Sequence, residues 1–247
     1  MVAKVPPAGI TTYKGTPSAG DLGSGLHIKT ADSGGDVHAT GDEFVLENSG
    51  DCGMTILSGT SNHGRISFGD SGDNNIGYIT YDHGSNAMSV VTNAATAMTI
   101  DSIGAVTKPL QPAFNAKHST TQSNLDINGG SPITIAFGTE IFDQNADFNT
   151  TTSTFTAPVT GRYQLNFHTY MADVDDDFAY LQLNLVTSNR QYNLILENSG
   201  EDGYDNFAFS TLADMDASDT AYVQIEGSGG ADQLDLSQSH FSGYLAC

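Results

Sequence analysis

The chain has 247 residues, of which 29 are acidic and 8 are basic, so its formal net charge is -21 at pH 7. So few cations cannot replace the condensed counterions of a nucleic acid, and the negative charge disfavours contact with an anionic membrane surface. The acidic side chains of such a chain repel one another strongly, and either salt or bound divalent cations would weaken that repulsion. The charge therefore predicts a saline environment or bound divalent cations.

The composition favours strands and tight turns. Glycine occurs 27 times, and no window shows an apolar period of 3.6 residues. The two cysteines, Cys52 and Cys247, make neither a disulfide framework nor a metal site. The opening MVAKVPPAGITTYKG lacks the apolar core of a secretory signal, and no stretch is typical of a transmembrane span. We therefore expect an all-β chain that is made in the cytosol or exported without a secretory signal.

Residues 1–30 are predicted to form an extended N-terminal arm. Large apolar side chains are rare there, and Pro6, Pro7 and Pro17 prevent regular strand pairing. Three lysines stand against one aspartate, so the arm carries about +2 and the remainder about -23. A mildly basic arm ahead of an acidic body suits an anchor that becomes ordered on a partner; a frayed terminus is the alternative.

Residues 31–108 are predicted to form a stalk of consecutive short antiparallel strands. Turn residues recur about every 8–12 positions between the apolar runs of EFVLENSG, GMTILSG, GRISFGDSGD, IGYITYDHGSN, AMSVVTN and AMTIDSIGAV. Each run offers few large apolar side chains, so a single copy would bury little surface. Three copies wrapped together could bury these faces, and we therefore expect a trimeric stalk.

A linker and a head follow the stalk. Residues 109–113 contain Pro109 and Pro112 and are predicted to be a stiff connection. Residues 114–247 are numerous enough to build a core of their own. Strands are expected near 112–118, 132–137, 154–158, 161–170, 178–187, 191–197, 205–212, 219–226 and 240–246.

A set of spaced residues organises the head. These residues are Phe137, Asp143, Phe148, Phe155 and Gly161, followed by Tyr163, Leu165 and Phe167 in alternation with polar residues. Their spacing, with FSGYL at 241–245, resembles the C1q globular-head family of the C1q/TNF superfamily over roughly residues 110–247. The family favours an aromatic residue where this chain has Leu165. The resemblance implies a ten-stranded jelly roll that trimerises around a three-fold axis.

The stalk carries a second resemblance. VLENSG at 45–50, ILSGTS at 56–61, ISFGDSGDNNIGYITYDHGSNAM at 66–88 and MTIDSIGAV at 98–106 are similar to repeat-like regions of bacteriophage tail fibres. This implies a homotrimeric fibre, made in the host cytoplasm and exposed on the virion, that works as a receptor-binding adhesin. Its arm would contact other virion proteins, and its head would contact a host surface glycan or protein. The alternatives are a head fibre or capsid decoration protein, or a free C1q-like lectin.

Two kinds of site are expected in the head. The acidic cluster Asp173, Asp175, Asp176 and Asp177 is predicted to lie in the turn after the signature strand. Since several C1q-family heads bind calcium with carboxylates from this region, the resemblance implies a Ca²⁺ site there; a solvated acidic turn is the alternative. A second acidic loop contains Glu201, Asp202 and Asp205. Candidate aromatic residues for stacking on sugar rings in the loops are Tyr192, Tyr204, Phe207 and Tyr222.

No enzyme activity is predicted. GDSG at 69–72 resembles the nucleophile turn of chymotrypsin-like proteases, but the rest of that family's pattern is missing. The seven histidines show no ligand spacing in the sequence, and His63 and His83 are interpreted as turn residues. Carboxylate pairs for glycoside cleavage could be drawn from so many acids, but the chain has no room for the long β-helix of phage depolymerases.

Overall fold

The computed structural model describes residues 26–127, 131–175, 178–197, 203–229 and 233–247. All the regular secondary structure in these ranges consists of β-strands, which confirms the all-β prediction. None of the described segments is a helix long and apolar enough to cross a membrane. The chain divides into two compact units, the first comprising the residues up to Arg65 with Asp82–Gly84, the second comprising Ile66–Tyr81 with Ser85–Cys247.

The first unit contains a small parallel sheet built around a buried carboxylate. Strand β1 (Leu26–Lys29), at the end of the predicted arm, pairs in parallel with β2 (Phe44–Glu47), so the antiparallel pairing predicted for EFVLENSG was wrong. Glu47 Oε1 accepts hydrogen bonds from Ser33 N–H at 2.8 Å and Ser33 Oγ at 3.0 Å, and Lys29 Nζ lies 3.1 Å away. His27 Nε2 lies 2.9 Å from Glu47 Oε2. The Ser33 backbone N–H, with help from Lys29, lowers the pKa of Glu47 to about 2.

Acidification should therefore loosen the β1–β2 pairing. Because the folded pKa of Glu47 lies below its ordinary value of 4.5, the stabilisation is complete above that value and is lost as pH falls toward about 2. Glu47→Gln should remove the effect and increase amide hydrogen exchange in β1 already at neutral pH. An NMR titration of the carboxyl groups and β1 amides tests this, with exposed Glu43→Gln as the control. A β1 that is equally protected in both variants would contradict it.

The predicted stalk contains a five-stranded sheet in the order β3-β4-β5-β6-β7. Its strands are β3 (His63–Phe68), β4 (Gly77–Asp82), β5 (Ala87–Thr92), β6 (Ala95–Ile100) and β7 (Val106–Thr107). The β5-β6 and β6-β7 pairs are antiparallel, as predicted. GMTILSG forms no strand, so that expectation was wrong. Large apolar side chains on these strands are exposed, among them Ile66, Phe68, Ile79 and Met88, with Phe68 at 59%.

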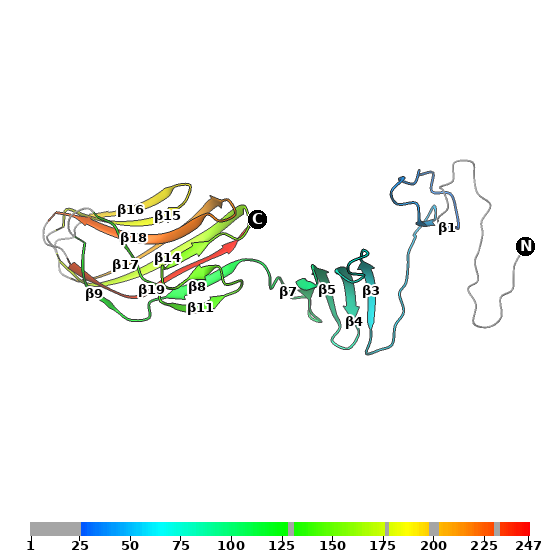
Figure 1. The fold of residues 1–247 in the computed structure, drawn as a ribbon, viewed down its shortest axis with the longest axis horizontal. Helices are drawn as coiled ribbons and strands as arrows, with labels where there is room; N and C mark the ends of the chain where they lie inside the picture. Colours follow the sequence, from blue (N-terminus) through cyan, green and yellow to red (C-terminus); the bar gives the residue numbers. More distant parts are fainter. Residues whose placement is uncertain (1–25, 128–130, 176–177, 198–202, 230–232) are drawn as a thin grey trace, which may run out of the picture. The chain divides into compact units, whose positions relative to one another are not determined.

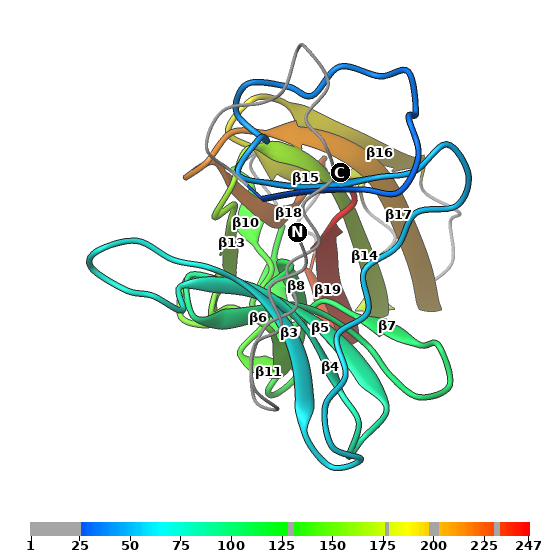
Figure 2. The same cartoon turned by 90° about the vertical axis from the view of Figure 1, so that its right-hand side faces the viewer.

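The head is a sandwich of two six-stranded sheets (Figures 1 and 2). One has the order β12-β13-β18-β15-β16, with β10 also on β18; the other has the order β11-β8-β19-β14-β17, with β9 also on β19. The first comprises β10 (Ile133–Thr134), β12 (Phe148–Asn149), β13 (Thr154–Thr156), β15 (Tyr180–Thr187), β16 (Gln191–Glu197) and β18 (Thr220–Ser228). The second comprises β8 (Ala113–Lys117), β9 (Gln122–Asp126), β11 (Thr139–Asp143), β14 (Gly161–Val174), β17 (Gly203–Met215) and β19 (Gln233–Leu245).

The core of the head lies between these two sheets. The predicted alternation on β14 is confirmed, because Tyr163, Leu165 and Phe167 are buried whereas the residues between them are more exposed. Phe114 stacks on Phe148 at a centroid distance of 5.0 Å and on Phe155 at 4.7 Å. Phe114, which lies outside the signature, therefore joins the signature residues Phe148 and Phe155 in one aromatic cluster. Burial of these rings contributes to the stability of the head.

Several strands differ from the predicted bounds. The strand predicted at 161–170 continues to Val174, because β17 and β19 pair with it beyond Tyr170. The strand predicted at 132–137 is reduced to β10, and β19 begins at Gln233 rather than 240. β9, β11 and β12 were not predicted. Each of these three is short or has an irregular pattern of burial, so its apolar period is weak.

The predicted linker is held against the head by side-chain amides. Gln144 Nε2 donates to Lys108 O at 2.9 Å and to Gln111 O at 2.7 Å. Asn145 Nδ2 donates to Leu110 O at 3.0 Å, and Gln111 Nε2 donates to Leu245 O at 2.6 Å. These bonds satisfy backbone carbonyls in a proline-containing segment that has little secondary structure of its own.

Candidate functional site

The predicted acidic cluster begins inside a strand rather than in a turn. Asp173 lies within β14 with a φ of 47°, at the point where the register with β17 shifts. Asp175 follows the strand; its N–H donates to Gln233 O at 3.2 Å, and its Oδ2 accepts from Gln233 N–H at 3.0 Å. Asp176 and Asp177 lie outside the described residues. The turn placement is therefore wrong for Asp173, because a β-bulge lets the strand continue past Tyr170.

The second predicted acidic loop is only partly described. Glu201 and Asp202 lie outside the described residues, and Asp205 lies in β17 opposite Met171. Across the described ranges, no three His, Cys, Asp or Glu side chains are grouped so that they could hold a metal ion. The carboxylates of Asp173 and Asp175 would therefore need further ligands, from water, from residues 176–177 or from other copies, to reach the six to eight oxygens of Ca²⁺.

The four candidate aromatic residues lie on strands and not in loops, so that expectation was wrong. Tyr192 is on β16, Tyr204 and Phe207 are on β17, and Tyr222 is on β18. Tyr192 and Phe207 pack against the core, because the strand alternation turns them toward it. Tyr204 is 69% exposed, and its ring lies 6.0 Å from that of Tyr170. Tyr204 is thus the candidate best placed to stack on a ligand.

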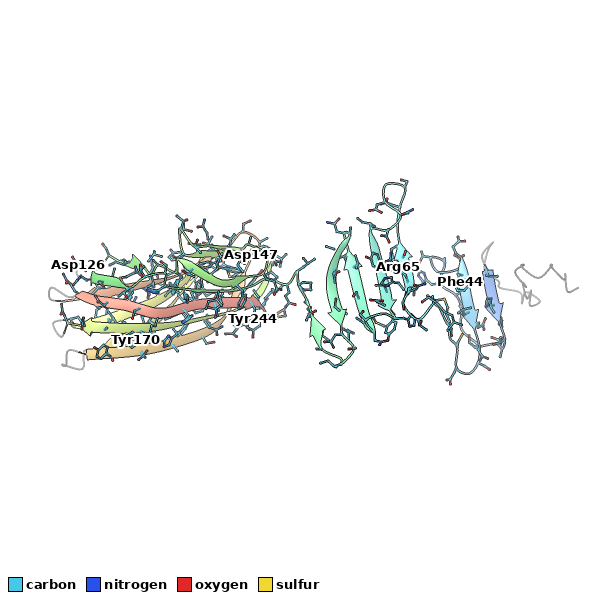
Figure 3. The ribbon with its side chains drawn as sticks, turned by 90° about the horizontal axis from the view of Figure 1, so that it is seen from below. Phe44, Arg65, Asp126, Asp147, Tyr170 and Tyr244 are labelled. Atoms are coloured by element: carbon cyan, nitrogen blue, oxygen red, sulfur yellow. The ribbon has the colours of Figure 1, made fainter. Side chains whose placement is uncertain are left out.

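A pocket of about 590 Å³ lies in the head where loops gather around Asp147. Figure 3 places Asp147 and Tyr244 at one end of the head, and Asp126 and Tyr170 at the other. The pocket lining includes Asp147, Asn149, Thr150, Pro158 and Ser218. Burial, followed by the charge of Asp143, raises the pKa of Asp147. The pocket combines a carboxyl group, an amide and hydroxyls in a volume that suits a small hydroxylated ligand.

The structure also brings together two histidines that the sequence did not connect. β14 and β19 are neighbours in register, with His168 directly opposite His240. On the other side of β19, His240 is opposite Lys117 of β8. A groove of about 310 Å³ contains both histidines, and its other lining residues are Asn166, Phe167, Ala208, Phe209, Ser210 and Ser242. No spacing in the sequence could reveal the pair, since only the strand register creates it.

Comparison with known proteins identifies the head. A sequence model of the C1q domain matches residues 113–246, more than half of the chain. This match, together with the two facing sheets, confirms the predicted jelly-roll head. No curated protein sequence matches the chain.

Three solved structures are similar to part of this chain. The globular domain of zebrafish complement 1qA protein has a TM-score of 0.42 and 22% identity, and the match covers 56% of this chain and 98% of that one. Murine APRIL at pH 5.0 has a TM-score of 0.41 and 12% identity, with coverages of 55% and 98%. The PRD1 vertex protein P5 has a TM-score of 0.39 and 12% identity, with coverages of 55% and 96%.

Proposed function

This chain belongs to the C1q domain family, and we propose that it is a homotrimeric fibre protein of a phage-like particle whose head binds the host surface. In this proposal the arm anchors the fibre to other virion proteins, the stalk spaces the head from the particle, and the head contacts a surface glycan or protein. The protein is then a structural and binding protein and not an enzyme, and it is located on the virion.

One observation carries this proposal: the stalk sheet exposes apolar side chains on several neighbouring strands. Ile66 and Phe68 of β3, Ile79 of β4 and Met88 of β5 are all exposed in a single copy. A sheet of short strands needs a second layer to be stable in water, and exposed apolar area of this kind marks an association surface. Other copies of the same sheet would supply that layer. The phage-fibre resemblance of residues 45–106 supports the same arrangement.

The pocket near Asp147 supports a binding role for the head. Much of its lining, including Asp147, Thr150, Pro158 and Ser218, lies in connections between strands, and such connections commonly carry binding residues. Hydroxyl and amide groups there can hydrogen-bond the hydroxyls of a saccharide. Three equivalent sites on a trimer would strengthen a weak contact through multivalency.

We also propose that Ca²⁺ binds at Asp173 and Asp175 together with the neighbouring Asp176 and Asp177. Since calcium binds the folded state, free calcium at about 100 times its Kd should stabilise the head by about 2.7 kcal/mol. Asp173→Asn and Asp175→Asn, made singly, should reduce this gain. Thermal unfolding with calcium and with chelator measures it, and exposed Glu140→Gln on β11 is the control. Equal melting temperatures in calcium and chelator would argue for a solvated acidic cluster instead.

Two measurements test the fibre function. Electron microscopy of particles that carry this chain, labelled with antibodies against the head, should show the label on fibres that project from the particle. The purified full chain should bind bacterial cells, and Asp147→Asn should weaken that binding without changing the oligomeric state. Label on the capsid surface without cell binding would favour a decoration protein, and a chain found on no particle would favour a free lectin.

A further inference from the structure

Strand register places two histidines side by side on the outward face of one head sheet. His168 of β14 is directly opposite His240 of β19, and both residues alternate with buried core residues along their strands. Directly opposite residues of an antiparallel pair have Cβ atoms about 4.5–5.5 Å apart. Burial, followed by the charges of His168 and Lys117, lowers the pKa of His240, so the two imidazoles are close enough to interact. Two rings at this separation can reach one metal ion between them.

The groove of about 310 Å³ that contains both histidines leaves room for such an ion. On β17, Ala208 is opposite His168 and Ser210 is opposite Asn166, and both small residues line the groove. Short side chains at these positions keep the space beside the imidazoles open. A metal ion and the water molecules bound to it fit in a volume of this size.

Oxygen atoms for further coordination positions lie in the next row of the same face. Ser242 of β19 is opposite Asn166 on one side and opposite Asn115 of β8 on the other. Asn115 Oδ1 is buried and has no hydrogen-bond partner among the residues that the structure describes. Asn166 Oδ1, by contrast, already accepts from Ser210 Oγ at 2.7 Å. The Ser242 hydroxyl and the Asn115 oxygen can therefore complete a site, directly or through bound water.

This set of donors favours a transition-metal ion over calcium or magnesium. Imidazole nitrogen suits Zn²⁺, Ni²⁺ and Cu²⁺, whereas Ca²⁺ and Mg²⁺ prefer the oxygens of carboxylates and carbonyls. Within the described ranges no third His, Cys, Asp or Glu joins the pair. A tetrahedral zinc ion would thus take two imidazoles from the protein and fill its other two positions with oxygen ligands. The net charge of -21 attracts cations to the molecule as a whole.

We propose that His168 and His240 form a binding site for a divalent transition-metal ion such as Zn²⁺ on the outward face of the head. The bound ion joins β14 to β19, at about 2.0–2.1 Å from one nitrogen of each ring. The pair is present within one copy, so the site depends neither on the homotrimer nor on the fibre function nor on the calcium site proposed above. Because the strand register exists only in the folded head, the ion stabilises the folded state.

The charge of Lys117 weakens this site. Lys117 of β8 is opposite His240. The residue is exposed, so its long side chain can hold the ammonium group in solvent while the ion occupies the groove. Lys117→Gln should therefore tighten zinc binding by roughly two- to fivefold. An unchanged affinity would count against an ion at His240.

Isothermal titration calorimetry with zinc chloride tests the site on the full chain. Cys52→Ser and Cys247→Ser form the background, because cysteine thiolates also bind zinc. We expect about one zinc ion per chain at this site, since zinc would be held by one histidine pair. His168→Asn and His240→Asn, made singly, should each weaken binding at least about tenfold. Unweakened binding in folded head variants, verified by circular dichroism, would overturn the proposal.

A matched control removes two histidines from another part of the chain. His63 and His83 lie in the predicted stalk, outside the matched C1q domain. His63→Asn/His83→Asn should bind zinc as the background does. If this control loses binding while the head variants keep it, the ion is bound in the stalk and the proposal is wrong. Excess calcium chloride should not displace the zinc, and displacement would show an oxygen site instead.

A crystal of the background chain soaked in zinc chloride locates the ion without any histidine variant. Anomalous scattering at the zinc absorption edge should give a peak between the rings of His168 and His240. This measurement decides the question if a histidine variant fails to fold. Zinc peaks at other residues, with none in this groove, would overturn the proposal.

Discussion

Phe114→Ala should destabilise the head by about 3–5 kcal/mol, which is a large part of the stability of an ordinary domain. Phe114 is 1% exposed and contacts three other rings. It stacks on Phe148 and Phe155, and Phe241 meets it edge-on at a centroid distance of 5.0 Å. The substitution removes ring contacts to both sheets at once. Phe114 and Phe241 lie in one sheet, and Phe148 and Phe155 lie in the other.

Urea unfolding of the full chain, monitored by near-ultraviolet circular dichroism, measures this loss. Phe142→Ala is the matched control, because Phe142 lies on β11 and is 49% exposed. The control should change the free energy of unfolding by less than about 1 kcal/mol. Equal effects of the two substitutions would mean that the four-ring cluster does not hold the sheets together.

The last three signature residues were predictable because burial along β14 has period two. Tyr163, Leu165 and Phe167 alternate with polar neighbours over a long central strand, and each is buried as predicted. β11 could not be predicted in the same way. Its apolar Ile141 and Phe142 are adjacent and exposed, because the strand lies at the sheet edge and its register shifts between Glu140 and Phe142.

The sequence predicted much less about possible sites than about strands. The acidic cluster was placed in a turn because the apolar alternation weakens after Tyr170, although hydrogen bonding to β17 and β19 continues. The pairing of His168 with His240 depends on which strands become neighbours. Likewise, the sequence shows Glu47 only as the residue that ends an apolar run. The partners of its carboxylate, Lys29 and Ser33, come from a different strand and from a loop. Contacts between distant residues of this kind leave no periodic signal in the chain.

Gly243 belongs to the FSGYL segment and lies opposite Leu165, so it joins the two parts of the family signature. Strand register places Gly243 between Leu165 of β14 and Phe114 of β8. A Cβ atom there would lie 2.6 Å from Leu165 Cδ2, 2.9 Å from Phe114 Cε1 and 3.1 Å from the backbone oxygen of Gln164. All three distances are shorter than ordinary van der Waals contact. Glycine is therefore required at this position by packing and not by backbone conformation.

Gly243→Ala should destabilise the head by about 1–3 kcal/mol through overpacking. Leu165→Ala alone should cost about 2–5 kcal/mol, because it leaves a cavity in the same place. In the double variant the added methyl group fills part of that cavity, so the combined loss should be smaller than the sum of the single losses. A double-mutant cycle by urea unfolding measures the difference, which should exceed the roughly 0.5 kcal/mol expected for independent sites. Additive losses would show that the backbone of β14 and the ring of Phe114, rather than Leu165, exclude a side chain at this position.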